Sequence, residues 1–431
     1  MRIQRRRLLQ VAVVGTAAVG VAGGGALLSR PESDVDTPAP ARAGSGIAAL
    51  RQRVARLPDD WTAWAALGMA LLEQARSTGD PGGYPEAERA LRRSLEVRPK
   101  GNAAAATGLG VLAAARHDFG AALDWGREAV AADAYSAPAQ GVIADALVEL
   151  GRYEQAWPAV QRMVDLRPDT GSLARASYTW QLRGETARAL TLMGQARTLA
   201  PDGGQAAFTA THLAELAFDT GDLATAARHV ADGLRQAPGY PPLRAAEARV
   251  AAARGDTAGA ARTWTALVAR IPQPGFLAEY GDLLAATGDA AGARGQYDTV
   301  RAAARLQAAR GVDVDLELAL FLADRGEAGP ALSMARATYA RRPSIAAADA
   351  LAWALHAAGE RREAMSRADE ALRLGTRSPA MLYHRGMIAA ADPAHARRAR
   401  ADLDAALRLN PRFSPWHAPR ARATLARLAA A

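Results

Sequence analysis

Apolar positions along most of this chain recur every three or four residues, which is the spacing of one face of an α-helix. Two such sets each extend over two neighbouring helical segments. The first is Leu147, Leu150, Ala156, Val160 and Met163. The second is Leu351, Leu355, Ala364, Ala368 and Ala371. The alternation rich in Val, Ile and Thr that is typical of strands does not appear. We therefore expect an all-α chain of short amphipathic helices.

The helical segments form a repeat, which ten alanines mark. The steps between them are 33 to 38 residues: Ala87, Ala122, Ala156, Ala189, Ala226, Ala260, Ala293, Ala331, Ala364 and Ala399. A Gly or Ala usually lies about twelve residues before each repeat alanine, and a Pro often lies about twelve residues after it. Turn signals such as Gly221-Asp222 and Gly255-Asp256 stand between the two small residues. This period of about 34 residues predicts one helix pair per repeat.

Each part of the repeat has a physical role. Gly tolerates the left-handed backbone that ends a helix, and an acidic residue at the start of the next helix is favoured by the helix dipole. The two small residues allow the paired helices to approach closely. Pro separates one pair from the next because it cannot continue a helix.

The repeats resemble those of the tetratricopeptide family. Trp64, Leu67 and Gly68 match the W-x2-L-G start of the family's motif, and Ala87 and Pro99 continue it in the second helix. The resemblance implies an extended binding surface rather than a catalytic pocket.

The resemblance also implies an architecture. We expect a right-handed α-solenoid of about ten helix-turn-helix repeats over residues 46–412. Residues 413–431 should form a C-terminal capping helix, because the end repeats must cover an otherwise exposed apolar face.

In this family the first helix of each pair lines the concave face, so the positions beside its small residue should point into a groove. Mapped onto this chain, they give a partner-binding set: Asp145, Tyr178, Phe208, Glu215, Arg249, Asp282, Trp353, His356 and Tyr383. Acids, aromatics and an arginine suit an extended peptide or a partner helix. We expect Trp353 and Tyr383 to be exposed anchors, since large aromatics on an exposed helix face usually contact something.

The amino terminus predicts a targeting segment. Arg2, Arg5, Arg6 and Arg7 precede an uncharged apolar run of 21 residues, 8–28, which is long enough to span a bilayer. Arginines before such a run favour a cytoplasmic amino terminus. The rest of the chain would then lie outside the cytoplasm.

Three forms of this segment stay open. One form is an uncleaved anchor, in which residues 8–28 of the segment 1–30 span the membrane. The second is a cleaved secretory signal, and the third is a twin-arginine signal. Residues 31–45, with their acids and prolines, then form a flexible linker. In each case we expect an extracytoplasmic chain that is anchored to the cell membrane or secreted.

Composition excludes some classes of partner and site. The formal net charge is +9, but five arginines lie in residues 1–30 and leave 48 basic against 44 acidic side chains. No dense basic stripe with interleaved aromatics is present, so we expect no nucleic-acid partner. The absence of Cys removes disulfides, thiolate metal sites and a cysteine nucleophile.

We find no motif that supports catalysis. The sequence has no Gly-rich phosphate loop, no H-E-x-x-H and no G-x-S-x-G. His212 and Glu215 share a helical face, but one such pair supplies too few ligands for a closed zinc site. We predict no catalytic residue, no cofactor and no metal.

The sequence thus predicts a non-catalytic protein-protein interaction scaffold or assembly factor. It would hold a protein or peptide partner in the concave groove on the extracytoplasmic side. The alternative is a binder of an envelope glycan or another small ligand, and the third possibility is an unrecognised hydrolase.

Overall fold

The computed structural model describes residues 43–78, 81–200, 203–309 and 315–430, and the regular structure within them is helical. The predicted signal or anchor segment, 1–30, lies outside the described residues. Among the helices that the structure does describe, none has both the length and the apolarity of a membrane span.

The described residues form 22 α-helices in chain order. Their bounds are α1 Ala43–Arg56, α2 Trp61–Thr78, α3 Tyr84–Val97, α4 Ala103–Ala115, α5 Phe119–Ala132, α6 Ala137–Glu149, α7 Tyr153–Leu166, α8 Thr170–Leu182, α9 Thr186–Thr198, α10 Gly203–Asp219, α11 Leu223–Gln236, α12 Pro241–Arg254, α13 Thr257–Arg270, α14 Pro274–Ala286, α15 Ala290–Ala309, α16 Asp315–Asp324, α17 Ala328–Arg341, α18 Ile345–Ala357, α19 Arg361–Ala371, α20 Pro379–Ala390, α21 Ala396–Leu409 and α22 His417–Ala430. Helices α2 to α21 pack as ten consecutive pairs, with α1 against α2 and α22 against α20 and α21. The predicted all-α repeat solenoid is confirmed.

The small residues of the repeat lie where the two helices of a pair touch. All ten repeat alanines, on the second helix of each pair, are at most 2% exposed. On the first helix of the last pair, a Cβ added to Gly386 would lie only 2.8 Å from Cδ2 of Leu403. A larger side chain at such a position would push the helices apart, which is why the sequence repeats Gly and Ala there.

The Gly-Asp turns both end one helix and begin the next. Gly255 has a φ of 94° and caps α12 in the left-handed conformation. The side chain of Asp256 then accepts a hydrogen bond from the backbone N–H of Gly259 at 2.8 Å and caps α13. The dipeptide thus satisfies a first-turn N–H group and reverses the chain within two residues.

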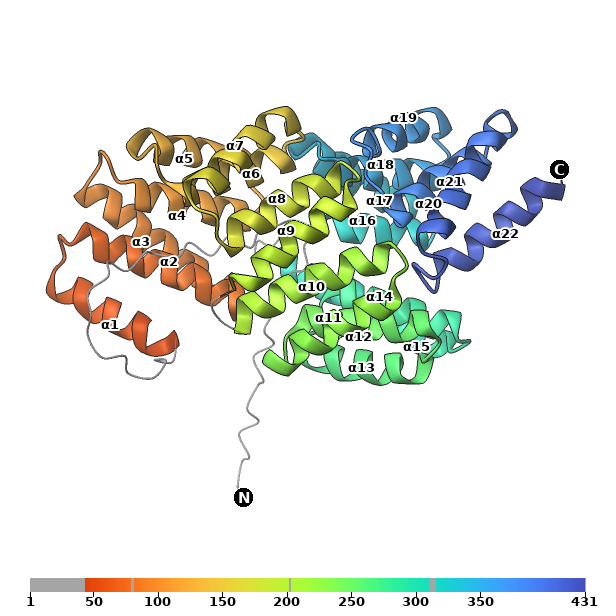
Figure 1. Cartoon of the computed structure of the whole chain (residues 1–431), viewed down its shortest axis with the longest axis horizontal. Helices are drawn as coiled ribbons and strands as arrows, with labels where there is room; N and C mark the ends of the chain where they lie inside the picture. Colours follow the sequence, from red (N-terminus) through yellow and green to blue (C-terminus); the bar gives the residue numbers. More distant parts are fainter. Residues whose placement is uncertain (1–42, 79–80, 201–202, 310–314, 431) are drawn as a thin grey trace, which may run out of the picture.

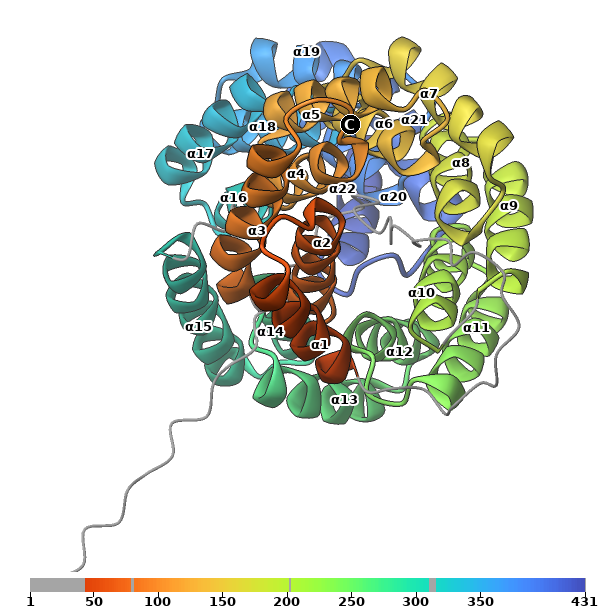
Figure 2. The ribbon, with the colours of Figure 1, turned by 90° about the vertical axis from the view of Figure 1, so that its left-hand side faces the viewer.

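The pairs wind into a superhelix around an axis (Figure 1). Viewed along that axis, α8, α10 and α12 lie inside α9, α11 and α13 (Figure 2). The first helix of these pairs therefore faces the interior, as the resemblance implied.

The superhelix closes on itself, because its second turn packs against its first. The hydroxyl oxygen of Tyr153 accepts a hydrogen bond from the backbone N–H of Ile345 at 2.8 Å, across 192 residues of sequence. The Asn410 amide donates to the carbonyl oxygen of Phe218 at 2.7 Å, again across 192 residues. The two turns are thus matched in a constant register, and we call this contact the seam.

Further contacts make the seam tight. The guanidinium of Arg342 lies 3.6 Å from the carboxylate of Glu149, and both side chains are largely buried. Gly151, at a φ of 67°, approaches the carbonyl oxygen of Pro343 so closely that a Cβ there would overlap it. The seam therefore combines hydrogen bonds, an ion pair and close backbone packing.

The carboxyl-terminal segment returns to the interior. Helix α22 lies near the axis, against α20 (Figure 2). The ring of His417 stacks on Tyr383 with centroids 4.7 Å apart, and its Nε2 lies 3.0 Å from Oδ1 of Asp324 in α16. The end of the chain therefore covers part of the concave face.

Candidate functional site

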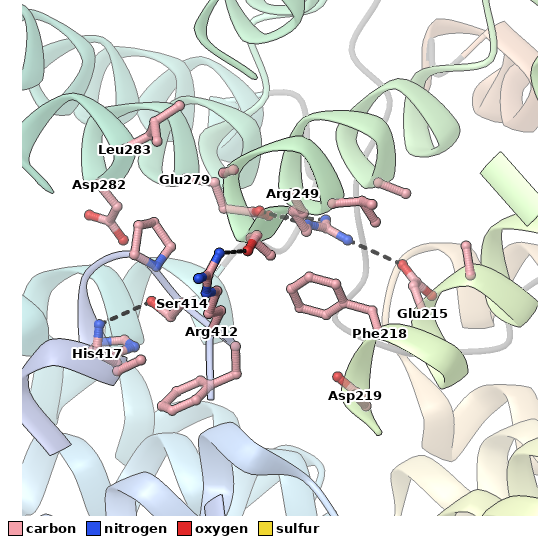
Figure 3. Close-up of a pocket in the computed structure, with 18 of the residues that line it drawn as sticks. Glu215, Phe218, Asp219, Arg249, Glu279, Asp282, Leu283, Arg412, Ser414 and His417 are labelled. Atoms are coloured by element: carbon pink, nitrogen blue, oxygen red, sulfur yellow. Dashed lines mark hydrogen bonds and ion pairs between the residues drawn. The ribbon is translucent and has the colours of Figure 1, made fainter. Parts of the chain in front are cut away.

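A cavity of about 600 Å³ lies between the inner helices and this returning segment. Helices α10, α12 and α14 form one side of it, and the segment around Arg412 to Arg422 forms the other (Figure 3). Apolar side chains contribute much of its lining, among them Phe218, Val250, Leu283 and Phe413. The helical side of the cavity follows from the repeat, because each inner helix presents the same face to the axis.

Ion pairs across successive inner helices set the polar side of the cavity. Arg249 of α12 lies 2.6 Å from Glu279 of α14 and 3.4 Å from Glu215 of α10. His212 lies 3.3 Å from Glu215 on the same helix. Figure 3 shows Arg249 between the two carboxylates. The pairs hold three helices in register and fix the direction of each charged group.

The pKa values of this network follow from the pairing. Burial raises the pKa of Glu215, but His212 and Arg249 lower it further, so the pKa lies below its usual value. Burial disfavours the charged form of Arg249, yet Glu279 and Glu215 raise its pKa above the usual value. Both partners therefore carry their charge at neutral pH.

Asp282 of α14 belongs to a second network at the edge of the cavity. Its carboxylate pairs with Arg325 and accepts a hydrogen bond from the Tyr297 hydroxyl at 3.0 Å. Burial raises the pKa of Asp282, and Arg325 offsets this only in part.

Asp219 differs from the other cavity carboxylates. It is the last residue of α10, and its side chain makes no hydrogen bond or ion pair within the part of the chain that the structure describes. Burial and the charge of Glu215 raise its pKa to about 7, and Arg249 lowers it only in part. Asp219 is thus a poorly compensated carboxyl group at a partly enclosed surface.

The structure brings three of the predicted groove residues together at the cavity: Glu215, Arg249 and Asp282. Phe208 lies on the same helix as Glu215 and packs edge-on against His212, with centroids 4.5 Å apart.

Two further predicted residues lie elsewhere on the inner helices. Asp145 pairs with Arg175 at 2.7 Å. Tyr178 packs in a separate apolar cluster, where burial raises its pKa well above the usual value. They therefore belong to the packing between repeats near the seam.

The prediction that Trp353 and Tyr383 are exposed anchors is wrong. Trp353 is 7% exposed and donates its indole N–H to Asp324, while Tyr383 is 1% exposed. His356 stacks on Trp353 with centroids 5.0 Å apart and is only partly exposed. The physical reason is the returning carboxyl-terminal segment, whose Phe413 packs on Tyr383.

Several cavity residues were not among those predicted from the sequence. Asp219 follows Glu215 by one helical turn and Glu279 precedes Asp282 by one turn, so a longer helical stripe would have found both. Arg412 carries no such signal. Its guanidinium donates to the carbonyl oxygen of Ala253 at 2.7 Å, across 159 residues of sequence.

No group of three or more His, Asp or Glu side chains in the described residues is arranged to hold a metal ion.

Comparisons with known proteins give structural similarity only. No protein-family model matches the chain, and no curated protein matches it. A thermophilic TPR protein of Thermus thermophilus is 23% identical over 43% of this chain and 95% of that chain, with a TM-score of 0.38. A tetratricopeptide repeat protein from Parabacteroides merdae is 17% identical over 60% of this chain and 98% of that chain, with a TM-score of 0.33. The helix-pair architecture described above rests on this chain's own geometry.

Proposed function

We propose that this chain is a non-catalytic interaction scaffold of the tetratricopeptide type, which binds a segment of a protein or peptide partner at the cavity on its inner face. The cavity itself carries the proposal, because its charged groups are already fixed by the pairs of Arg249 with Glu215 and Glu279. A preorganised surface loses less ordering entropy on binding. Apolar surface from Phe218 and Phe413 beside these charges suits a segment with both kinds of side chain.

The proposal includes an extracytoplasmic location, either anchored to the membrane or secreted. Its support is the cluster of arginines before the uncharged run of residues 8–28. A protease-protection assay on intact cells would test it: the repeats should be cleaved when protease is added outside the cytoplasmic membrane. Full protection until that membrane is lysed would contradict it.

A second candidate function is the binding of a small envelope ligand such as a glycan. The cavity volume of about 600 Å³ favours it, because small-molecule sites usually measure roughly 300–1,000 Å³. A glycan that raises the melting temperature of the purified chain in the absence of any protein would support this alternative.

The two candidates differ in what crosslinking recovers from the native envelope. The bait is the tagged full chain, compared with Ala252→Phe, which places a phenyl ring in the cavity from α12, where Ala252 is one of the lining residues. The matched control is Ala224→Phe on α11, where the alanine is exposed and outside the cavity. Both variants are first checked for the parent's melting temperature.

The scaffold proposal expects proteins that are recovered with the parent and with Ala224→Phe but lost from Ala252→Phe. Equal recovery with all three baits would contradict binding at the cavity. Recovery of no specific protein with any bait would favour the small-ligand alternative.

A further inference from the structure

Asp219 places a carboxyl group where three features of the fold disfavour its charged form. It ends α10, and the carboxyl end of a helix carries a partial negative charge that repels a carboxylate. Glu215 lies one turn earlier on the same helix and adds a second like charge. Burial removes the water that would otherwise stabilise the ion.

We propose that Asp219 is the counter-ion for a basic side chain, lysine or arginine, of the bound peptide, which enters the cavity as an ammonium or guanidinium group on an apolar stem. This inference rests on the proposed function and names the chemistry that its site would recognise.

The other charged groups of the cavity already have partners within the chain. Arg249 is held by Glu279 and Glu215, and Asp282 is held by Arg325. Each of these groups therefore has an oppositely charged partner before any ligand arrives.

The cations of the returning segment also have hydrogen-bond acceptors within the chain. Arg412 donates to the carbonyl oxygen of Ala253 at the carboxyl end of α12, where the helix dipole favours a cation. Arg422 donates to the carbonyl oxygen of Pro411 at 2.8 Å. His417 lies 3.0 Å from Asp324. Asp219 is thus the carboxylate of this cavity with most to gain from a new cation.

The surroundings of Asp219 suit an organic cation better than a metal ion. Within the described residues no three metal-ligating side chains converge. Phe218 is the neighbouring residue, and Figure 3 shows its ring beside Asp219 in the cavity. Val250 and Phe413 add further apolar lining. The methylene stem of lysine or arginine packs on such surfaces while its charged end reaches a carboxylate.

Binding of a cation here is coupled to a proton. The pKa of Asp219 is about 7, so the group must release its proton before it can pair with a cation below that pH. The affinity should therefore fall by up to about tenfold for each pH unit below 7. The charged groups that share the cavity with Asp219 also contribute: Glu215, Arg249, Glu279, Asp282, Arg412, His417 and Arg422.

The test is a selection of phage-displayed short random peptides on the full chain at pH 8. The same selection is made on Asp219→Asn, which is nearly isosteric, and on the control Asp124→Asn, whose carboxyl group on α5 is 81% exposed. A synthetic copy of an enriched peptide, with blocked ends, is then compared with a copy that has norleucine in place of the basic residue. Free n-butylamine serves as the small-amine probe.

The parent and Asp124→Asn should enrich peptides with lysine or arginine at one fixed position. Norleucine at that position should weaken binding to the parent by about tenfold or more. Asp219→Asn should bind both peptides equally weakly. The proton coupling predicts that binding to the parent also weakens from pH 8 to pH 6.

Each contrary result overturns a defined part. Suppose that the enriched peptides contain no basic residue and that Ala252→Phe abolishes their binding. The proposed function would then stand, and the role of Asp219 would be wrong. The role of Asp219 would also be wrong if no peptide is enriched while crosslinking still recovers a protein that depends on the cavity. If n-butylamine binds as tightly as the peptides, the ligand is a free amine and the peptide is not needed.

Discussion

His384 lies 2.9 Å from the carboxylate of Asp349, and both side chains are buried between α18 and α20. Burial lowers the pKa of His384, but the charge and hydrogen bond of Asp349 raise it further, so its pKa lies above the usual value. The last repeats are therefore joined by a charged pair at the level of the aromatic cluster around Trp353.

The first prediction concerns this pair. His384→Leu should lower the free energy of unfolding by about 3–5 kcal/mol, because it leaves Asp349 buried without a partner. The double variant His384→Leu/Asp349→Leu should be less destabilised than the single one. Urea denaturation at pH 6 measures both. Equal losses in the two variants would contradict a charged pair.

The pair also predicts a pH dependence. The stabilisation by His384 is complete below its unfolded-state pKa of about 6.5 and is lost as the pH rises through the higher folded-state pKa. The free energy of unfolding of the parent should therefore decrease on the alkaline side of neutrality by more than that of the double variant.

The second prediction concerns the hydrogen bond across the seam. Tyr153→Phe removes the acceptor of the Ile345 amide and leaves a buried N–H group unpaired. The expected loss is about 1–3 kcal/mol, with faster hydrogen exchange at Ile345. Tyr135→Phe is the control, because Tyr135 is 77% exposed. Unchanged exchange at Ile345 in Tyr153→Phe would show that the seam does not depend on this bond.

The third prediction separates backbone strain from seam packing. Gly151 and Gly359 both have a positive φ, but only at Gly151 would a Cβ meet another part of the chain. Gly359→Ala should cost about 1 kcal/mol through the left-handed backbone alone. Gly151→Ala should cost about 1–3 kcal/mol more, because Pro343 must move. Thermal denaturation of both variants tests this, and equal melting temperatures would contradict a tight seam.

The fourth prediction concerns Asp219 in the absence of ligand. Its folded-state pKa of about 7 lies above the usual carboxyl value of about 3.9, so the folded chain holds a proton that the unfolded chain releases. The contribution of Asp219 to the free energy of unfolding is therefore complete at acidic pH and is lost as the pH rises through its folded-state pKa of about 7. Asp219→Asn should match the parent at pH 4 and exceed it at pH 8, by roughly 1–3 kcal/mol. A variant less stable than the parent at pH 8 would contradict a poorly compensated carboxylate.

Local features of the fold could be predicted because each repeat carries its own signal. The burial of Ala87 or Ala399 and the capping turn at Gly255-Asp256 depend on contacts within one helix pair. Such contacts join residues that are close in sequence, so period and residue type are enough to place them.

The site could be predicted only in part, for a physical reason. Glu215, Arg249 and Asp282 occupy the same position in three successive repeats, and the cavity brings them together. The covering of Trp353 and Tyr383 depends instead on a segment after the last repeat, which has no equivalent elsewhere in the chain. Periodicity carries no information about such a segment.

The seam could not be predicted at all, because it matches residues 192 positions apart without any complementary motif. The seam also determines the mechanical response of the solenoid. A superhelix whose neighbouring turns make no contact extends like a spring under small forces. In the described part of the chain the seam joins the turns, so this part should resist extension at first and then lengthen in one step when the seam contacts break. The seam thereby also fixes the width of the superhelix, and the partner that we propose must fit that width rather than increase it.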